Sequence, residues 1–287
     1  MPKIIAIANQ KGGVGKTTTA INLSACLSVA EKRTLLIDLD PQGNSSVGLG
    51  LDRANYSDKN IYHVLLGECA IENAIYKTEL PFLDVCPSTT DLSGAEVELV
   101  NQLARESKLK MAMEPILDRY DYIIIDCPPS VGLLTVNALN FAESYLTPLQ
   151  TEYFAMEGLT QLVNLAKLIK AGLNPRLEHR GIVLTMFDTR NNLHKQVVED
   201  VRKNFGDKVF KTVIPRNVKL SECPSFGKPI ILYDIESKGS EAYFGVAKEI
   251  LVQDRVVAPM PQYRPSEDME CPPLHTIAST EEHHAVQ

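Results

Sequence analysis

Short runs of apolar, mostly β-branched residues recur along the chain, and most are followed by a segment whose apolar positions return at helical spacing. Runs such as Tyr122–Ile125 are apolar throughout, which is typical of strands buried on both faces of a sheet. The pattern predicts strands at Lys3–Ala8, Thr34–Asp38, Phe82–Pro87, Tyr122–Asp126, Ser144–Pro148, Gly181–Met186 and Val209–Ile214. It predicts helices at Lys16–Val29, Gly94–Leu117, Leu133–Ala142, Met156–Ala171, Leu193–Asn204 and Ser240–Leu251. This alternation predicts an α/β fold, a single doubly wound and mostly parallel sheet flanked by helices.

The regular pattern ends near residue 258. Residues 1–258 are predicted to form one domain, and residues 259–287, with five of the 17 prolines and a net charge of −4, are predicted to form a flexible acidic tail. The 287 residues are 44% hydrophobic and 23% charged, a composition that argues against disordered, collagenous and coiled-coil proteins. No apolar run reaches the roughly 18 to 20 residues that span a bilayer, and the start lacks a signal-peptide pattern, so we expect a cytoplasmic protein.

A glycine-rich segment with two lysines stands between the first predicted strand and the first predicted helix. Glycines there let consecutive backbone N–H groups turn around an anion, and the helix N-terminus adds its dipole, so the loop is predicted to bind phosphates. Lys16 is expected to reach the β- and γ-phosphates, and the Thr17 hydroxyl to hold Mg²⁺. The strict phosphate-loop pattern has glycine at position 10, where this chain has Gln10. The candidate nucleotide-binding residues are Lys11, Gly12, Gly13, Val14, Gly15, Lys16, Thr17 and Thr18.

Three acids follow or end predicted strands. Asp38 and Asp40 come at the end of one strand, and Asp126 ends another. Ligands bind outside the carboxyl ends of parallel strands, so these acids are expected to converge on Mg²⁺ and the terminal phosphate. Asp126 fits a Walker B role, in which the carboxylate acts on magnesium directly or through water.

The net charge of −7 argues against a nucleic-acid partner, but the charge is unevenly distributed. The window 189–220 has eight cations against three anions, a net charge of +5, which a nucleic-acid phosphate backbone would attract. The six cysteines form no C-x-x-C or C-x-x-H pair, so we expect scattered reduced thiols and no zinc or iron–sulfur site.

The motifs Lys11-Gly-Gly-Val-Gly-Lys-Thr-Thr18, Asp38-Leu-Asp-Pro-Gln-Gly43 and Ile125-Asp-Cys-Pro-Pro-Ser130 resemble those of the deviant Walker A ATPases. With Leu184–Asp188 and Ile214–Glu222, the chain closely resembles the ParA partitioning ATPases of the Soj type over roughly residues 1–255.

The resemblance implies a role for each matching residue. Two protomers would hold ATP between them face to face, with Lys11 reaching the partner's phosphates and Lys16 serving its own nucleotide. Asp40 would position the attacking water, and Asp38 and Asp126 would lie nearer the metal. Pro215 and Asn217 would contact the base and the facing subunit. For DNA binding without sequence preference, Arg190 matches a family position and Lys219 stands where relatives often have arginine. Arg216 is a further candidate for this contact.

The implied cycle comprises ATP binding, dimerisation, loading on the nucleoid, and hydrolysis stimulated by a ParB-type centromere-binding partner. MinD-like regulators share the nucleotide chemistry but bind membrane through a basic C-terminal helix, whereas this chain ends in an acidic segment, so no membrane attachment is expected. The nitrogenase iron protein bridges a cluster with two cysteines per chain, which raises Cys86 and Cys127 as a further possibility. A nucleotide-gated DNA-binding regulatory module with incidental hydrolysis also remains open.

Overall fold

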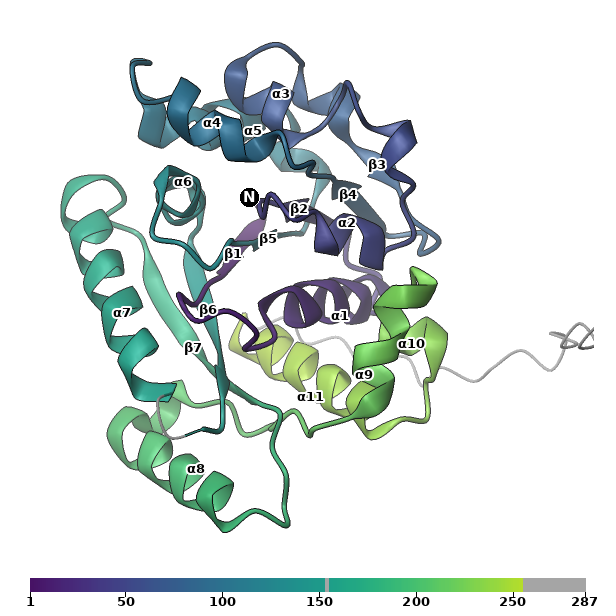
Figure 1. The fold of residues 1–287 in the computed structure, drawn as a ribbon, viewed down its shortest axis with the longest axis vertical. Coiled ribbons are helices and arrows are strands. Elements are labelled where there is room, and N and C mark those ends of the chain that lie inside the picture. Colours follow the sequence, from purple (N-terminus) through teal and green to yellow (C-terminus); the bar gives the residue numbers. More distant parts are fainter. Residues whose placement is uncertain (153–154, 255–287) are drawn as a thin grey trace, which may run out of the picture.

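A seven-stranded sheet forms the centre of the computed structural model, which describes residues 1–152 and 155–254 (Figure 1). The strand order is β3-β4-β2-β5-β1-β6-β7, and all neighbours are parallel except the antiparallel pair β3 and β4. The strands are β1 (Lys3–Ile7), β2 (Thr34–Asp38), β3 (Tyr76–Lys77), β4 (Leu83–Cys86), β5 (Tyr122–Asp126), β6 (Ser144–Gln150) and β7 (Glu178–Thr185).

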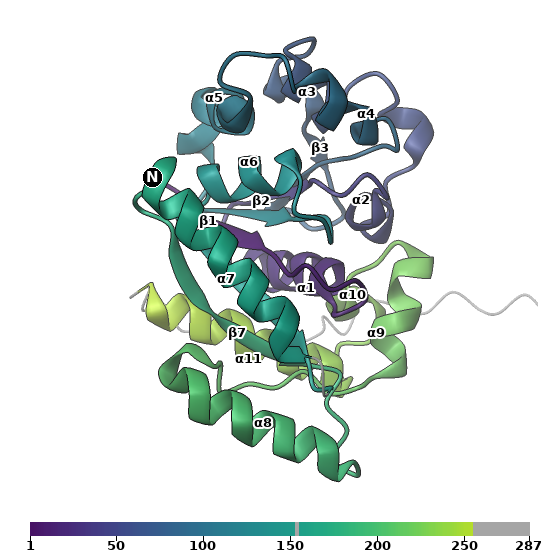
Figure 2. The same ribbon diagram turned by 60° about the vertical axis from the view of Figure 1, so that its left-hand side comes forward.

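Helices cover both faces of the sheet, as Figures 1 and 2 show. The α-helices are α1 (Lys16–Val29), α2 (Asn44–Gly48), α3 (Ile61–Leu66), α4 (Leu92–Glu98), α5 (Lys108–Met113), α6 (Leu133–Phe141), α7 (Ala155–Gly172), α8 (Asn192–Phe205), α9 (Val218–Glu222), α10 (Ile230–Tyr233) and α11 (Lys238–Gln253). The prediction of a doubly wound, mostly parallel sheet is therefore confirmed.

Successive residues of β1 contribute to opposite faces of the sheet. Ile5 and Ile7 pack in the hydrophobic cluster that includes α1, α10 and α11. Ala6 and Ala8 pack in the cluster that includes α3 to α7. Both faces are therefore buried, which explains why the central strands are apolar throughout rather than alternating.

The strand order reverses beside β1, because the chain passes from β1 to β2 on one side and later to β6 on the other. Ligands of doubly wound sheets bind at such a switch point, outside the carboxyl ends of the strands. The segment that follows β1 is the glycine-rich loop, so the topology places that loop at the position where a ligand is expected.

Two predicted elements are wrong in the described part of the chain. Residues Val209–Ile214 form no strand: Val209 makes an isolated bridge to Ile182, and the N–H groups of Phe210 and Ile214 donate to carbonyls of β7. The segment Gly94–Leu117 is not one helix but a series of short helical pieces, including α4 and α5. The short elements β3, α2, α3, α9 and α10 were not predicted, because each is too short for its apolar residues to show a helical or strand spacing.

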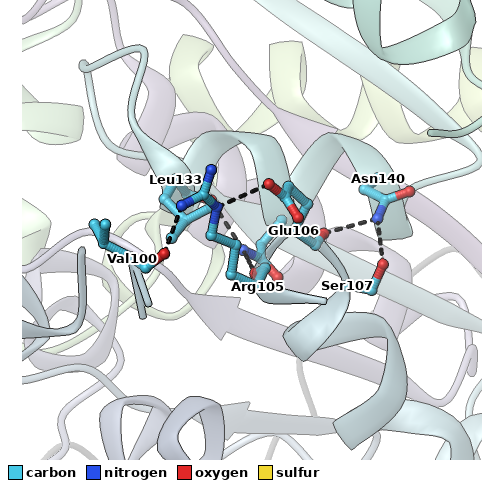
Figure 3. A network of polar contacts seen from close by, with 7 residues as sticks. Val100, Arg105, Glu106, Ser107, Leu133 and Asn140 are labelled. Atoms are coloured by element: carbon cyan, nitrogen blue, oxygen red, sulfur yellow. Dashed lines mark hydrogen bonds and ion pairs between the residues drawn. The ribbon is translucent and has the colours of Figure 1, made fainter. Parts of the chain in front are cut away.

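Side chains of α6 explain the break inside Gly94–Leu117 (Figure 3). Ala104, between α4 and α5, has a φ of 53°, a left-handed value that one continuous right-handed helix would not contain. Asn137 donates from its side-chain amide to the carbonyl of Arg105 at 2.8 Å, and Asn140 donates to the next carbonyl at 2.7 Å. These carbonyls are thus bonded to α6, which stabilises the turn between α4 and α5.

A buried ion pair fixes the end of α11 to the sheet. Arg180 on β7 and Asp254 lie 2.7 Å apart, and their side chains are 9% and 6% exposed. The hydroxyl of Tyr122 on β5 donates to the same Asp254 oxygen at 2.9 Å. The pair thus joins α11 to two strands.

We expect Asp254→Ala to lower the free energy of unfolding by about 2–4 kcal/mol, because it leaves the Arg180 guanidinium buried without a counter-charge. Urea unfolding measures the loss. The control is Glu178→Ala, which removes a surface ion pair with Lys170 and should change stability by less than about 0.5 kcal/mol. Similar losses for the two variants would contradict the structural role of the buried pair.

Candidate functional site

The loop from Asn9 to Gly15 connects β1 to α1 and carries the predicted phosphate-binding residues. Gly13 and Gly15 have φ values of 74° and 91°, in the left-handed region that favours glycine. The α1 N-terminus has no side-chain cap and no acid in its first turn, so its free N–H groups and dipole remain available to an anion. The hydroxyl of Thr185 donates to the Val14 carbonyl at 2.8 Å and ties the loop to β7.

Lys16 lies folded against this loop. Its side-chain ammonium donates to the Lys11 carbonyl at 3.1 Å, and the residue is only 7% exposed. Burial lowers the pKa of Lys16, and the nearby Asp126 opposes that shift most strongly. The structure therefore places a partly desolvated cation at the base of the loop, where a phosphate could replace the carbonyl as its partner.

Asp38 and Asp126 lie opposite each other in register at the carboxyl ends of β2 and β5, and both are 0% exposed. The backbone N–H and hydroxyl of Ser46 donate to Asp38 Oδ2 at 2.8 and 2.7 Å. The Ser45 hydroxyl donates to Asp126 Oδ2 at 2.7 Å. Asp126 Oδ1 has no hydrogen-bond partner among the described residues.

The two acids hold their protons more tightly than ordinary carboxylates. Burial, reinforced by the charge of Asp38, raises the pKa of Asp126 to about 7. Burial also raises the pKa of Asp38 to about 6, although the hydrogen bonds from Ser46 oppose the shift. The charge of Asp38 disfavours ionisation of Asp126, and a cation beside the two acids would offset this repulsion.

Asp40 lies in the turn after β2 and is 9% exposed. Its Oδ1 accepts a hydrogen bond from the Gln42 N–H at 2.9 Å, and its carbonyl accepts one from the Gly43 N–H at 2.9 Å. The Asp40 N–H donates to Asp38 Oδ1 at 3.3 Å. This tight turn therefore holds Asp40 beside the buried acids, and none of the hydrogen bonds among the described residues involves its second carboxylate oxygen.

The residues present fit a magnesium ion. Asp126 Oδ1 is a buried oxygen that lacks a partner among the described residues, and a hydrogen bond from the Thr17 side chain is among the effects that lower the Asp126 pKa. Carboxylate and hydroxyl oxygens are ligands that Mg²⁺ accepts. Among the described residues, no group of three or more His, Cys, Asp or Glu side chains could hold a metal. A magnesium ion here would thus need additional oxygens from water or phosphate.

Cys86 and Cys127 do not fit a cluster shared between subunits. Both thiols are reduced and 0% exposed, and both belong to the hydrophobic core on the α3–α7 face. Burial also raises the pKa of each thiol, which disfavours the thiolate that binds iron. The iron-protein alternative is therefore not supported by the position of these residues.

The predicted base-contact and DNA-contact residues lie after β7. Pro215 bridges to Phe187, and the Arg216 N–H donates to the Phe187 carbonyl at 2.9 Å, so this segment continues the edge of the sheet. Asn217 caps α9 by accepting a hydrogen bond from the Lys219 N–H at 2.8 Å. Because Thr185 at the end of β7 contacts the glycine-rich loop, the Pro215–Asn217 segment emerges at the same end of the sheet as that loop.

The three predicted DNA-contact side chains are exposed, and two of them have carboxylate partners. Arg190 contacts Asp188 at 2.7 Å, and Lys219 contacts Glu222 at 3.4 Å. Arg216 is exposed on the segment that bridges to Phe187. The structure thus brings Arg190 and Arg216 onto neighbouring loops, with Lys219 on α9 further along.

Several residues of the site were not anticipated from the sequence. Ser45 and Ser46 bind the two buried acids, Thr185 holds the loop, and Asn9 anchors it by donating to the Pro148 carbonyl at 2.8 Å. Only the serines carried a local signal, because they follow the Asp38-Leu-Asp40 segment within a few residues. The other contacts join positions more than a hundred residues apart.

The fold and the loop with its buried lysine and acids define a P-loop nucleotide-binding protein. Residues 2–179 match the family model described as AAA domain. The chain is 58% identical to the chromosome partitioning protein ParA of Myxococcus xanthus over 90% of each chain. It is 55% identical to the sporulation initiation inhibitor protein Soj of Bacillus subtilis over 87% of this chain and 98% of the relative. The chain therefore belongs to the ParA/Soj family of chromosome-partitioning ATPases.

Solved structures show the same fold. Cobyrinic acid a,c-diamide synthase from Mycobacterium smegmatis, with bound ADP and magnesium, is 34% identical with a TM-score of 0.79, over 92% of this chain and 100% of that chain. The cell division ATPase MinD of Pyrococcus furiosus is 30% identical with a TM-score of 0.72, over 88% and 100%. The family resemblance inferred from the motifs and the fold class predicted from the strand–helix alternation are thus confirmed.

The raised pKa of Asp126 predicts how the effect of Asp126→Asn on the free energy of unfolding depends on pH, in the absence of nucleotide and magnesium. The native state disfavours the ionised acid, so the wild type loses stability as pH rises from the unfolded pKa through about 7. The advantage of Asp126→Asn over wild type should therefore grow by about 1–3 kcal/mol between pH 5 and pH 8, measured by urea unfolding.

The control is Asp121→Asn, because Arg33 lowers the pKa of Asp121. Ionised Asp121 stabilises the native state, so this substitution should cost stability at pH 8 and progressively less as pH falls through the folded pKa. If the advantage of Asp126→Asn is constant between pH 5 and pH 8, the prediction is wrong.

Proposed function

We propose that this protein is a Mg-ATP-dependent partitioning ATPase that dimerises on ATP, binds DNA without sequence preference and segregates a chromosome or plasmid. The observation that carries the proposal is the glycine-rich loop with Lys16 at its base and, nearby, an Asp126 oxygen that has no hydrogen-bond partner in the part of the chain that the structure describes. The identity to ParA and Soj supports partitioning over the MinD-like alternative, since MinD of P. furiosus is only 30% identical. The acidic tail, on which the expected absence of membrane attachment depended, lies outside the described residues.

Within this proposal, each residue of the site has a separate task. Lys16 and the loop N–H groups hold the phosphates, and Thr17 and Asp126 hold Mg²⁺, with Asp38 acting through water because its oxygens already accept hydrogen bonds. The bound magnesium would neutralise charge on the phosphates. Asp40 would orient the attacking water through its second oxygen. No strong base is evident at the site within residues 1–152 and 155–254, so we expect slow hydrolysis without a partner.

ATP would also connect two protomers. Two triphosphates that face each other repel unless cations lie between them. A dimer would therefore be stabilised if each protomer placed a lysine against the phosphates bound to its partner. Lys11 is the residue assigned to this contact. Pro215 and Asn217, on the segment that continues from β7, would contact the base and the facing subunit.

DNA binding would follow from dimerisation. Arg190, Arg216 and Lys219 are exposed, and they lie within the window of net charge +5 in a chain of net charge −7. One copy of this surface would bind phosphates weakly, whereas two copies linked in a dimer would bind more tightly. A lysine at position 219 contacts phosphate as a point charge, without the two-pronged geometry of arginine.

The cycle would end when a ParB-type centromere-binding partner stimulates hydrolysis and the protomers separate. The proposed location is the cytoplasm, on the nucleoid while ATP is bound. Among the described residues, no helix is long and apolar enough to span a bilayer. A regulatory module with incidental hydrolysis would differ in one respect: Asp40→Ala, which should trap the dimer on DNA, would leave segregation intact.

Substituting the two loop lysines separates nucleotide binding from dimerisation. Lys16→Ala should weaken ATP binding about tenfold to hundredfold, because a charge-assisted contact is lost. Lys11→Ala should change monomer affinity by less than about threefold yet abolish ATP-dependent dimerisation. Titration with a fluorescent ATP analogue and sedimentation velocity measure the two effects. Normal dimerisation of Lys11→Ala would remove the basis for a lysine that crosses between protomers.

DNA retention with ATP, ADP or no nucleotide across a salt series tests the DNA surface. Only the ATP state should bind, and Arg190→Ala, Arg216→Ala or Lys219→Ala should each lower the slope of log affinity against log salt by about 2, because a dimer loses two phosphate contacts. Lys110→Ala, an exposed cation on α5, is the control and should leave the slope unchanged. Equal binding with ATP and ADP would contradict nucleotide gating.

A further inference from the structure

The Lys11 side chain is paired inside its own protomer. Its ammonium lies 3.1 Å from Glu152 Oε2, with side-chain exposures of 35% for the lysine and 49% for the glutamate. Glu152 follows the end of β6, so this contact joins positions 141 residues apart. A lysine that must reach a neighbouring molecule is thus already bound to a carboxylate of its own chain.

Further contacts hold both members of this pair in place. The Gln150 side-chain amide donates to Glu152 Oε1 at 2.5 Å, so each carboxylate oxygen has a partner. The Lys11 N–H donates to Asn9 Oδ1 at 3.0 Å. A Cβ added at Gly158 of α7 would lie 3.7 Å from the Lys11 Cβ, which places α7 directly against the loop (Figure 2). Lys11 is therefore bonded within its own chain at two points, through its backbone N–H and through its side-chain ammonium.

We propose that Glu152 is a positioning residue that retains Lys11 in its own protomer and so raises the protein concentration at which ATP drives dimerisation. The inference rests on the proposed function, in which Lys11 crosses to the partner's phosphates. Lys11 has one ammonium group, and moving it to another molecule requires that the contact with Glu152 opens. Since both protomers contribute a lysine, two such contacts open in each dimer.

Glu152 opposes dimerisation for a second reason. Once Lys11 has left, the Glu152 carboxylate remains at the position from which the lysine departed, near the surface that receives the partner. A triphosphate brought to that surface carries the same sign of charge, and like charges in proximity repel. The carboxylate therefore acts against association both before and after the lysine moves.

The test is Glu152→Gln, which removes the charge while keeping the shape of the side chain. An exposed ion pair changes an equilibrium by about 1.4-fold to fivefold, so opening two should change the dimer dissociation constant by about twofold to thirtyfold. With a saturating nonhydrolysable ATP analogue, sedimentation velocity should show tighter dimerisation of Glu152→Gln by that factor. Its affinity for the analogue at nanomolar protein, where the chain is monomeric, should match that of wild type.

Glu143→Gln provides a matched control. Glu143 pairs with Lys3 at 2.8 Å with similar exposures, 39% for the lysine and 45% for the glutamate, but at the amino end of the sheet. This variant should dimerise like wild type. The advantage of Glu152→Gln should also shrink between about 50 mM and 500 mM NaCl, because salt screens both the ion pair and the repulsion.

The double variant Lys11→Ala/Glu152→Gln tests whether the effect acts through Lys11. It should stay monomeric, and ATP-dependent dimerisation of this variant would overturn the proposal. Weaker or unchanged dimerisation of Glu152→Gln would also overturn it, since Glu152 would then guide the lysine or do nothing. If wild type itself binds the analogue but never dimerises, the proposed function fails, a result distinguishable from failure of Glu152→Gln alone.

Discussion

Two buried carboxylates side by side are the constraint on which the site depends. Asp38 and Asp126 are paired in register on adjacent parallel strands, and Lys16 is the buried cation assigned to the same site. Burial away from water raises the pKa of both acids, and the charge of Asp38 adds to the shift of Asp126. A divalent cation with phosphate oxygens would satisfy the acids and the lysine together. The geometry therefore favours a metal–phosphate ligand over either component alone.

The sheet brings these groups together from distant parts of the sequence. β1 lies at the switch point, so its carboxyl end is open to a ligand and is flanked by β5, which carries Asp126, and by β6. Asn9 fixes the loop to the end of β6, and Thr185 fixes it to β7. The segment after Phe187 then continues from the same edge. The residues predicted to bind nucleotide and the exposed cations are consequently carried by connected elements at one end of the sheet.

The sequence predicted the parts of this arrangement that have a local cause. The strands that end in Asp38 and Asp126 have apolar interiors, and the glycine-rich loop separates a strand pattern from a helix pattern. The predicted bounds of both strands therefore agree with the structure. Val209–Ile214 has the same apolar character but forms no strand among the described residues, because only its ends bridge or bond to β7. The contact of Lys11 with Glu152 could not be predicted from the sequence, because it depends on where the end of β6 lies relative to the loop.

Three of the four cations assigned to other molecules have a feature in common. Lys11, Arg190 and Lys219 each contact a carboxylate of the same chain within 3.4 Å. Binding a phosphate at any of them replaces one anion by another rather than capturing a free charge, and exposed pairs exchange at small cost. Each such exchange contributes little binding free energy. Several together can give tight binding, as they would when two protomers present their cations to the same DNA. A chain of net charge −7 with such neutralised cations would bind DNA poorly as a monomer, so in the proposed function dimerisation would be the step that determines whether DNA is bound.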